Sequence, residues 1–385
     1  MVAKSKTPAI RFKGFDREWN NENLEGMTSI NQGLQIAISN RFTKKIDGSY
    51  FYITNEFLKE GSNIKYYILN PPESVLCTKD DVLMTRTGNT GEVVTNIDGA
   101  FHNNFFKIKF DSRKLLKDYF VYFLKLPKTQ ALIMRLAGVS TIPDLNHKDF
   151  YSISMSFPKN TLEQTKIGNY FQNLDKLIEQ KERKQQKLKQ FKKAMLEKIF
   201  PKNGANTPEI RFKDFSGEWE EKIFGEIFDY ARPDNYVVKS TEYSNDYKTP
   251  VLTANKAFIL GYTNENNTFN KPSIIFDDFT LDFKLVDFSY MVKSSALKIL
   301  TIKDEKFDNL EFVYNLLQTT KIEILGHARH YISVVQPTRV YVPKIDEQTK
   351  IGNYFQKLDK LIDLQQKEIE KLKNIKKASL DKMFV

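Results

Sequence analysis

The chain has 385 residues, a length that predicts two or three domains. Its formal net charge of +11 indicates a polyanionic partner, and nucleic acid is the first candidate. A single cysteine, Cys77, excludes an internal disulfide and suits a reducing compartment, so we expect a cytoplasmic protein. No apolar run reaches the length of a membrane span, and the first residues contain no apolar core, so we expect neither a membrane anchor nor a signal peptide.

The chain opens with a motif that occurs twice. Residues 7–15 read Thr-Pro-Ala-Ile-Arg-Phe-Lys-Gly-Phe and lead to Trp19, and residues 207–215 read Thr-Pro-Glu-Ile-Arg-Phe-Lys-Asp-Phe and lead to Trp219. We call these the edge motifs. Internal repeats determine architecture before any other feature does, and this repeat divides the chain into two halves.

The regions that follow the edge motifs, residues 20–158 and 220–343, share little sequence but are both rich in predicted strands. We expect strands at residues 50–54, 81–86, 105–110, 272–276 and 295–300, and a helix late in each region, at 118–125 and 309–318.

Polar loops in both regions contain the side chains that we predict to contact DNA. The loop 85–91 places Arg, Thr and Asn at a strand end, and such side chains suit phosphates and base edges. The alternatives are a hairpin turn with exposed polar residues here and a solvated basic loop at residues 41–45. The predicted contacts in the first region are Arg41, Lys44, Lys45, Arg86, Thr87, Asn89, Thr90, Ser140, Thr141, Asn146, His147 and Lys148. In the second region they are Lys293, Ser294, Ser295, His327, Arg329, His330 and Tyr331.

Signatures of catalysis and of metal binding are incomplete. Residues 70–73, Asn-Pro-Pro-Glu, resemble an adenine methyltransferase motif but lack the aromatic residue that stacks on a flipped base, so we expect a turn. His327 and His330 have helical spacing, but no Cys or nearby carboxylate completes a zinc site. No Gly-Lys-Ser/Thr phosphate loop is present, which argues against an ATPase. We therefore predict no catalytic residue and no metal site.

The longest repeat closes each half. Residues 163–200 and 347–384 share 24 identities in 38 positions, and the first ten residues of the two copies are the same. Apolar residues recur at spacings of three and four, which predicts two long helices that pair through a coiled-coil seam. The predicted helix-pair and subunit-interface residues are Ile167, Phe171, Leu174, Ile178, Ile351, Phe355, Leu358 and Ile362. Polar residues interrupt this seam at Lys181, Gln185 and Lys192, so two helices on separate cores are the alternative.

The repeats would be almost evenly spaced around a ring if the ends of the chain were joined. Six residues separate Phe200 from Thr207, and seven would separate Phe384 from Thr7 if the termini were joined. Two successive modules would fit the same lengths, but the circular spacing favours a closed arrangement. We predict an α+β fold in which two pseudo-symmetric globular domains of mixed α/β structure are joined by two long antiparallel coiled-coil helices. The predicted bounds are 1–158 and 201–343 for the domains, and 159–200 and 344–385 for the helices.

Two of these features together resemble a known family. The repeated Glu-Gln opening, which follows Pro158 in one half and Pro343 in the other, and the edge motifs are similar to those of specificity subunits of type I restriction-modification systems. The resemblance covers essentially the whole chain. In the second half, residues 276–279 stand in place of the polar loop 85–91 but lack its glycines.

The resemblance implies a division of labour. Each globular domain would be a target-recognition domain that reads one half of a bipartite, asymmetric DNA site. The helices would act as a ruler and hold two methyltransferase subunits, which use S-adenosylmethionine to methylate adenine, and restriction/translocase subunits would join them. This chain itself would bind no cofactor and would not be an enzyme.

Two other classes stay open from the sequence. One is a coiled-coil scaffold that recruits proteins without binding DNA, and the other is an enzyme that acts alone. DNA affinity that falls steeply with salt separates the specificity subunit from the scaffold, because phosphate contacts release counterions. Activity without any partner would identify the enzyme.

Overall fold

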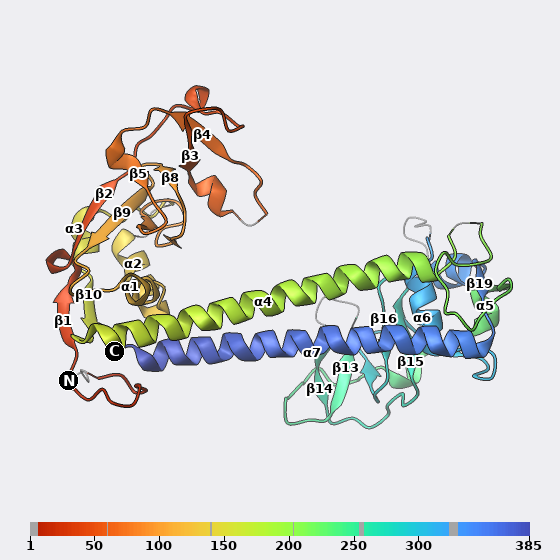
Figure 1. Ribbon diagram of the computed structural model, residues 1–385. Coiled ribbons are helices and arrows are strands. Elements are labelled where there is room, and N and C mark those ends of the chain that lie inside the picture. Colours follow the sequence, from red (N-terminus) through yellow and green to blue (C-terminus); the bar gives the residue numbers. More distant parts are fainter. Residues whose placement is uncertain (1–6, 60, 139–140, 203, 254–257, 323–329) are drawn as a thin grey trace. The chain divides into compact units, whose positions relative to one another are not determined.

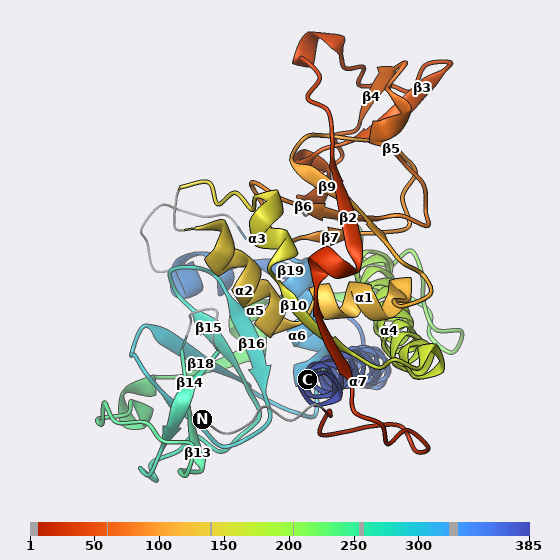
Figure 2. The same ribbon diagram turned by 90° about the vertical axis from the view of Figure 1, so that its left-hand side faces the viewer.

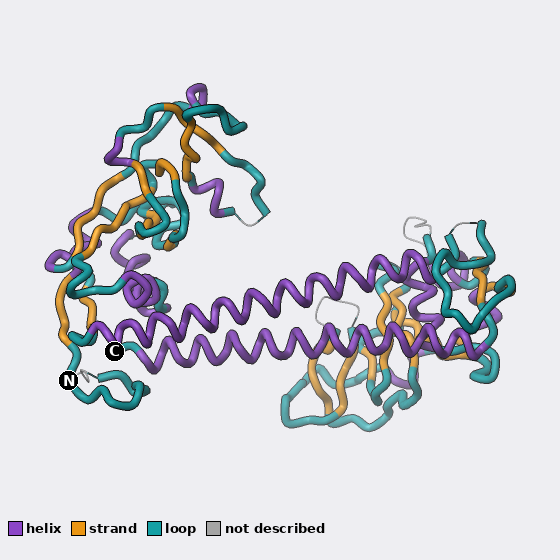
Figure 3. The backbone as a smooth tube through the Cα atoms, in the orientation of Figure 1, coloured by secondary structure: helices purple, strands orange, loops and turns teal. Residues whose placement is uncertain are grey.

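The computed structural model describes residues 7–59, 61–138, 141–202, 204–253, 258–322 and 330–385. The chain divides into two compact units, Met1–Lys181 with Glu368–Val385, and Glu182–Lys367. Each unit contains one globular domain and a stretch of each of two long helices (Figures 1 and 3). Among the described helices, none combines the length and the apolar composition that crossing a membrane requires.

The domain of the first unit contains two four-stranded sheets and a two-stranded ribbon among its described residues (Figure 2). One sheet has the order β2 (Thr28–Gln32), β9 (Phe105–Phe110), β6 (Val82–Thr85) and β7 (Val93–Val94). The other has the order β4 (Tyr66–Leu69), β3 (Ser49–Ile53), β8 (Gly99–Phe101) and β5 (Leu76–Cys77), and β3 runs parallel to β8. The ribbon pairs β1 (Asn20–Asn23) with β10 (Ser154–Phe157). The helices are α1 (Lys117–Leu124), α2 (Pro127–Ala137) and α3 (His147–Tyr151).

The domain of the second unit has a similar topology, with three strands in place of four in one sheet among its described residues. One sheet has the order β12 (Phe228–Ala231), β18 (Leu297–Ile302), β15 (Ser273–Asp277) and β16 (Phe283–Val286). The other has the order β14 (Ile259–Thr263), β13 (Thr249–Leu252) and β17 (Met291–Val292), and β13 runs parallel to β17. The ribbon pairs β11 (Glu220–Ile223) with β19 (Arg339–Val342), and the short helices are α5 (Phe224–Ile227) and α6 (Leu310–Thr319).

Single turns of tighter or wider helix complete both domains. The 3-10 turns are η1 (Leu24–Gly26), η2 (Ile38–Asn40), η3 (Asn55–Leu58), η4 (Glu73–Val75) and η5 (Pro233–Tyr236), and a π-helical turn, η6, spans Tyr331–Val335.

The long helices are α4 (Thr161–Ile199) and α7 (Ile345–Met383), each of 39 residues. In the first unit, the hydroxyl groups of Tyr170 and Ser379 share a hydrogen bond of 3.1 Å. In the second unit, Lys192 on α4 forms an ion pair of 2.7 Å with Asp359 on α7. The partner on α7 moves toward its N-terminus as α4 proceeds, so the helices are antiparallel, as predicted.

The polar residues that interrupt the apolar seam pair across it. Lys181 forms an ion pair of 2.5 Å with Glu368, and Gln185 donates a hydrogen bond of 2.8 Å to Gln366. These contacts exclude the alternative of two helices on separate cores. The predicted α+β class, with two domains and two long helices packed together, is confirmed.

Each domain core includes the start of one long helix and the end of the other. In the first unit, Phe171 of α4 and Phe384, which follows α7, lie in the same core as Trp19. In the second unit, Phe355 and Phe200 take the corresponding places beside Trp219. The helices are therefore built into the domains, and burial of their apolar ends stabilises the junctions.

Candidate nucleic-acid interface

The loop that follows β6 folds back on itself through Thr85. The Thr85 hydroxyl donates to the Asn89 carbonyl and accepts from the Glu92 amide at 2.9 Å, and the Gly91 amide donates to the Thr85 carbonyl at 2.9 Å. Gly88 and Gly91 have φ angles of 85° and 91°, which favour glycine because a β-carbon is strained there. As a result, Gly88 and Asn89 are exposed at the tip of the loop.

Arg86 links this loop to the segment before α3. Its Nη2 donates to Asp144 Oδ2 at 2.5 Å, and its guanidinium carbon lies 5.6 Å from the centre of the Phe106 ring. The Leu145 amide donates to the Arg86 carbonyl at 2.8 Å. The two candidate loops of the first domain therefore form one continuous surface element.

Thr90 also connects the loop 85–91 to the segment before α3. Its buried hydroxyl donates to the Pro143 carbonyl at 2.8 Å, and Thr87 and Asp144 form an isolated antiparallel bridge. Thr90 thus holds the loop in place and presents little surface to a ligand.

The structure sorts the predicted contacts by exposure. The exposed ones are Lys44, Lys45, Asn89, Thr141, Asn146, His147, Lys148, Ser294 and Ser295. The half-buried ones are Arg41, Arg86, Thr87 and Lys293, and the buried ones are Thr90, His330 and Tyr331. Ser140, His327 and Arg329 lie outside the described residues.

Arg41 is engaged within its own domain. Its Nε and Nη2 donate to the Ile36 carbonyl at 3.0 and 2.7 Å, and its guanidinium lies over the rings of Tyr52 and Tyr66 at 5.3 and 5.5 Å. Lys44 and Lys45 are exposed beside it, so these lysines are the cations of this loop that a phosphate can reach.

In the second domain, His330 and Tyr331 are fully buried. His330 Nδ1 lies 2.9 Å from the Asp278 carbonyl oxygen, and the Tyr331 amide donates to Asp278 Oδ1 at 2.8 Å. Side chains in these positions reach DNA only if the domain rearranges, and their predicted contacts stay predictions. Lys293 is half-buried and donates to the Tyr243 hydroxyl at 2.9 Å.

Arg86 and Asp278 occupy equivalent positions in the two domains. Thr85 pairs with Phe105 on β9, and Asp277 pairs with Leu297 on the equivalent strand β18, so the next residues, Arg86 and Asp278, correspond. Asp278 is buried and lies 3.5 Å from the ammonium group of Lys298, which stands where the first domain has Phe106. The first domain therefore has a partly exposed arginine at this position, and the second has a buried ion pair.

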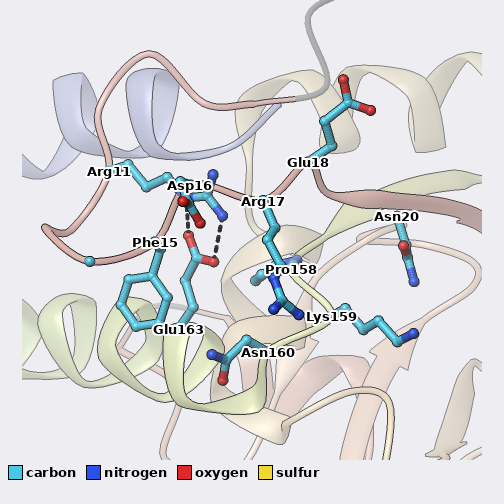
Figure 4. Close-up of a pocket in the computed structure, with 11 residues that line it drawn as sticks. Arg11, Phe15, Asp16, Arg17, Glu18, Asn20, Pro158, Lys159, Asn160 and Glu163 are labelled. Atoms are coloured by element: carbon cyan, nitrogen blue, oxygen red, sulfur yellow. Dashed lines mark hydrogen bonds and ion pairs between the residues drawn. The ribbon is translucent and has the colours of Figure 1, made fainter.

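The edge motif is held to the start of α4 by Glu163. Arg11 donates to this buried carboxylate through Nε and Nη2 at 2.6 and 2.9 Å (Figure 4). Trp19 Nε1 donates to the same carboxylate at 3.4 Å. A pocket of about 540 Å³ lies beside this pair and is lined by the edge motif and by residues 158–160 (Figure 4). In the second unit, Arg211 holds Glu347 in the same way, at 2.8 and 2.7 Å.

The glutamine that follows each of these glutamates joins two segments of its domain. It bonds to the residue directly before a short helix, α1 or α6, and to the proline that precedes the long helix. Gln164 accepts from the Leu116 amide at 2.8 Å and donates to the Pro158 carbonyl at 2.9 Å. Gln348 accepts from the Asn309 amide at 3.0 Å and donates to the Pro343 carbonyl at 2.9 Å. The repeated Glu-Gln pair is therefore a junction between edge motif, domain and helix. The sequence signal for this junction is the identity of the first ten residues in the two copies, because a helix seam alone requires only apolar residues at regular spacing.

The predicted seam residues lie in the cores and in the helix pair. Ile167, Phe171, Ile178, Ile351, Phe355 and Leu358 are buried, and Leu174 and Ile362 are partly buried. Phe171 contacts Tyr122 and Phe384, with ring centres 5.1 and 6.0 Å apart. Since most of these side chains are covered, they offer little surface to a partner chain.

Each unit leaves an apolar patch exposed on its helix pair. In the first unit this patch consists of Leu177 and Ile375, each 39% exposed, and in the second unit of Leu361 and Phe191, each 48% exposed. Each of these residues directly precedes a seam position, so in an antiparallel pair they fall on the same side of the seam. The internal repeat relates Leu177 to Leu361 and Phe191 to Ile375. We call these the two helix patches.

The two domains have similar topology and different loop chemistry, and both are built into a repeated helix pair. This arrangement defines an internally duplicated α+β protein. Among the described residues, no cluster of three or more His, Cys, Asp or Glu side chains could hold a metal ion.

The chain belongs to the family of type I restriction-modification DNA specificity domains, whose model matches residues 16–190 and 216–374. It is the DNA specificity subunit of such a system, a recognition subunit that is not itself an enzyme.

Individual relatives agree with this assignment. The chain is 42% identical over 132 residues to the type I restriction enzyme EcoR124I/EcoR124II specificity subunit of Escherichia coli, and the match covers 33% of each chain. It is 22% identical over 371 residues to the MjaVIII specificity subunit of Methanocaldococcus jannaschii, covering 88% of this chain and 86% of the relative. The fold is that of the type I restriction-modification S subunit from M. genitalium, with a TM-score of 0.70, 19% identity, and coverage of 98% of this chain and 99% of that one.

Proposed function

We propose that each domain of this specificity subunit reads one half of a bipartite, asymmetric DNA site. The observation that carries the proposal is the difference at one equivalent position of two similar domains: Arg86 is partly exposed in the first, whereas Asp278 in the second is buried beside Lys298. Because only the first domain offers an arginine to base edges at this position, two such domains read different half-sites.

The direct DNA contacts that we propose are the exposed polar residues of the candidate loops, together with Arg86 and Thr87. Lys44, Lys45 and Lys148 would contact phosphates and position the domain, whereas Asn89 and Asn146 offer amides suited to adenine. The contacts predicted at Ser140, His327, Arg329, His330 and Tyr331 remain part of the proposal.

The partners that we propose are two methyltransferase subunits, one on each helix patch. Two equivalent apolar patches, related by the internal repeat, suit two copies of one partner chain. Those subunits would use S-adenosylmethionine to methylate adenine, restriction/translocase subunits would join the complex, and the assembly would work in the cytoplasm. The domain bounds 1–158 and 201–343, with helices at 159–200 and 344–385, belong to the same proposal.

Binding to duplex DNA at two salt concentrations tests the central point. The subunit, assembled with its methyltransferase, should lose affinity steeply between 50 and 200 mM salt, by about 10³-fold or more if six or more phosphates are contacted. Affinity too weak to measure at low salt, or affinity that ignores salt, would favour the protein scaffold instead.

Substitution of one helix patch at a time tests the partner arrangement. Leu177→Asp with Ile375→Asp should remove one methyltransferase subunit, and Leu361→Asp with Phe191→Asp the other, because a carboxylate in an apolar interface is costly. Asn173→Asp, at an exposed polar position of α4, is the control and should leave the complex intact. Two bound subunits in every variant, measured by native mass spectrometry, would show that the patches are not the docking sites.

The proposed ruler function of the helices is tested by lengthening both together. Four residues inserted after Lys184 and four after Gln365, close to the contact between Gln185 and Gln366, would preserve the antiparallel pairing. The added length, roughly 6 Å at about 1.5 Å per residue, corresponds to one or two base pairs of roughly 3.4 Å. Mapping of methylated adenines should show the same half-sites with a spacer longer by about one or two pairs. An unchanged spacer with full activity would show that the helices do not measure distance.

A further inference from the structure

The Arg86 guanidinium is held in place, but few of its hydrogen-bond donors have a partner. Among the described residues, its one side-chain hydrogen bond is that from Nη2 to Asp144, and its Nε is buried without a partner. The donors at the end of the guanidinium, Nη1 and the second hydrogen of Nη2, are therefore left for a ligand. That end is the part of an arginine side chain that makes bidentate contacts with guanine or phosphate.

Two contacts restrict the freedom that an arginine side chain normally has. The Phe106 ring supports the face of the guanidinium, with 5.6 Å between its carbon and the ring centre. Asp144 fixes one edge at 2.5 Å, and the Arg86 side chain retains 18% exposure. An arginine restrained in this way loses less conformational entropy when it binds than a free one does.

Backbone hydrogen bonds fix the position of Asp144. Its amide donates to the Ala137 carbonyl at 3.1 Å, and it forms the bridge with Thr87. Its carboxylate is 48% exposed, among the polar side chains of the loop predicted to face DNA. A carboxylate there repels phosphates, so its presence weakens non-specific binding unless it acts through another residue.

We propose that Asp144 is a positioning residue, which orients Arg86 for a sequence-specific contact in the half-site read by the first domain. The inference rests on the proposed DNA-reading function and adds a specificity determinant to it. Asp144 acts on DNA through Arg86 and not by a base contact of its own. The discrimination between cognate and unrelated DNA should therefore depend on the two residues as one unit.

A double-mutant cycle tests this inference. The complete subunit with its methyltransferase is measured against two duplexes, one bearing the site mapped from the wild-type methylation pattern and one with that site scrambled. Asp144→Ala should reduce the ratio of the two affinities about tenfold, and in the Arg86→Ala background it should have no further effect. Asp144→Glu, which keeps the carboxylate, should recover part of the ratio.

The matched control is Asp98→Ala. Asp98 forms an exposed ion pair of 3.6 Å with Lys79, in a loop without candidate contacts, so this change removes the same charge. It should leave the affinity ratio unchanged. If Asp144→Ala fails to fold, Asp144→Asn, which removes the charge and keeps one neutral acceptor oxygen, replaces it in the cycle. The ratio should then fall by less than the roughly tenfold loss expected for Asp144→Ala, because a neutral acceptor holds the guanidinium more weakly.

The outcomes separate this inference from the proposed function. Wild-type protein that does not distinguish the duplexes overturns both. Wild-type protein that distinguishes them while Asp144→Ala matches it overturns the positioning role alone. Losses that add in the double variant would mean that Asp144 contacts a base directly, and a gain in non-specific affinity without loss of the ratio would mean that it only repels phosphates.

Discussion

Gly168 and Gly352 show how single residues determine the junction between domain and helix. A β-carbon at Gly168 would lie 2.8 Å from Asp118 Cβ, and one at Gly352 would lie 2.6 Å from Asn309 Oδ1. Both glycines therefore allow a short domain helix to approach the long helix closely. This requirement explains why a glycine recurs within an otherwise strong helical sequence.

Gly168→Ala should destabilise the protein, although alanine favours a helix over glycine by about 1 kcal/mol. The clash requires a backbone shift, which costs about 1–3 kcal/mol. Urea unfolding measures the difference, with Asn169→Ala, an exposed neighbour on the same helix, as the control that should be neutral or stabilising. A Gly168→Ala variant as stable as the wild type would contradict the close approach.

The thiol of Cys77 should be inert in the folded protein. Burial raises its pKa to about 12, so almost no thiolate is present at pH 8. We expect alkylation at pH 8 to be slow in native buffer and fast in denaturant, as followed by mass spectrometry. Equal rates in both conditions would show that the thiol is accessible.

At the scale of elements, ion pairs between the helices fix their register. Lys192 on α4 pairs with Asp359 on α7 in the second unit, and the repeat-related pair in the first unit is Lys376 with Asp175, at 2.5 Å. Each lysine takes a seam position, which an apolar residue would fill more favourably. Such polar seam positions specify one alignment of the helices at some cost in stability.

Charge reversal tests this register. Asp359→Lys should destabilise the second unit by about 1 kcal/mol, because it opposes two cations, and Lys192→Asp in addition should restore most of the loss. Thermal unfolding of the single and double variants measures the coupling. Losses that simply add would show that the two residues do not interact in solution.

The elements differ in how far the sequence predicts them. The long helices were predictable because their apolar period persists over many turns and occurs twice. The strands β3, β6 and β9 also lie close to their predicted ranges. In contrast, β13 contains Pro250, which lacks an amide hydrogen. Because proline is rare inside strands, its presence argues against a strand at this position in the sequence.

The candidate site was less predictable than the fold, because its contacts join residues far apart in sequence. The polar loop 85–91 was found from its composition, but the partner of Arg86 lies 58 positions away and follows no local pattern. His330 was predicted as a DNA contact, and the structure places it fully buried against the backbone of Asp278. Spacing predicts which side chains share an element, whereas pairing between loops requires the tertiary structure.

At the scale of the whole molecule, one contact between edge motif and helix end occurs in both units. In the first unit, the Ile10 amide donates to the Lys382 carbonyl at 2.9 Å, and in the second the Ile210 amide donates to the Lys198 carbonyl at 2.9 Å. The repeat relates these two contacts. The chain therefore has two equivalent junctions, and the linker 201–206 spans the second.

A circular permutant should fold and recognise the same DNA. Its chain would begin at Thr207, join Val385 to Thr7 through a copy of the linker 201–206, and end at Phe200. Since both junctions keep their contacts, we expect unfolding at a similar temperature and the same methylated sites in cells with the partner methyltransferase. An insoluble permutant, or one with a different site, would show that the junctions are not equivalent.

The central claim is that each domain reads its own half of the DNA site. The most direct measurement replaces residues 20–158 with the matching region of a relative that has a different known site, and maps methylated adenines across the genome. We predict that one half-site changes to that of the relative while the other half-site stays the same. A change in both half-sites, or in neither, would contradict it.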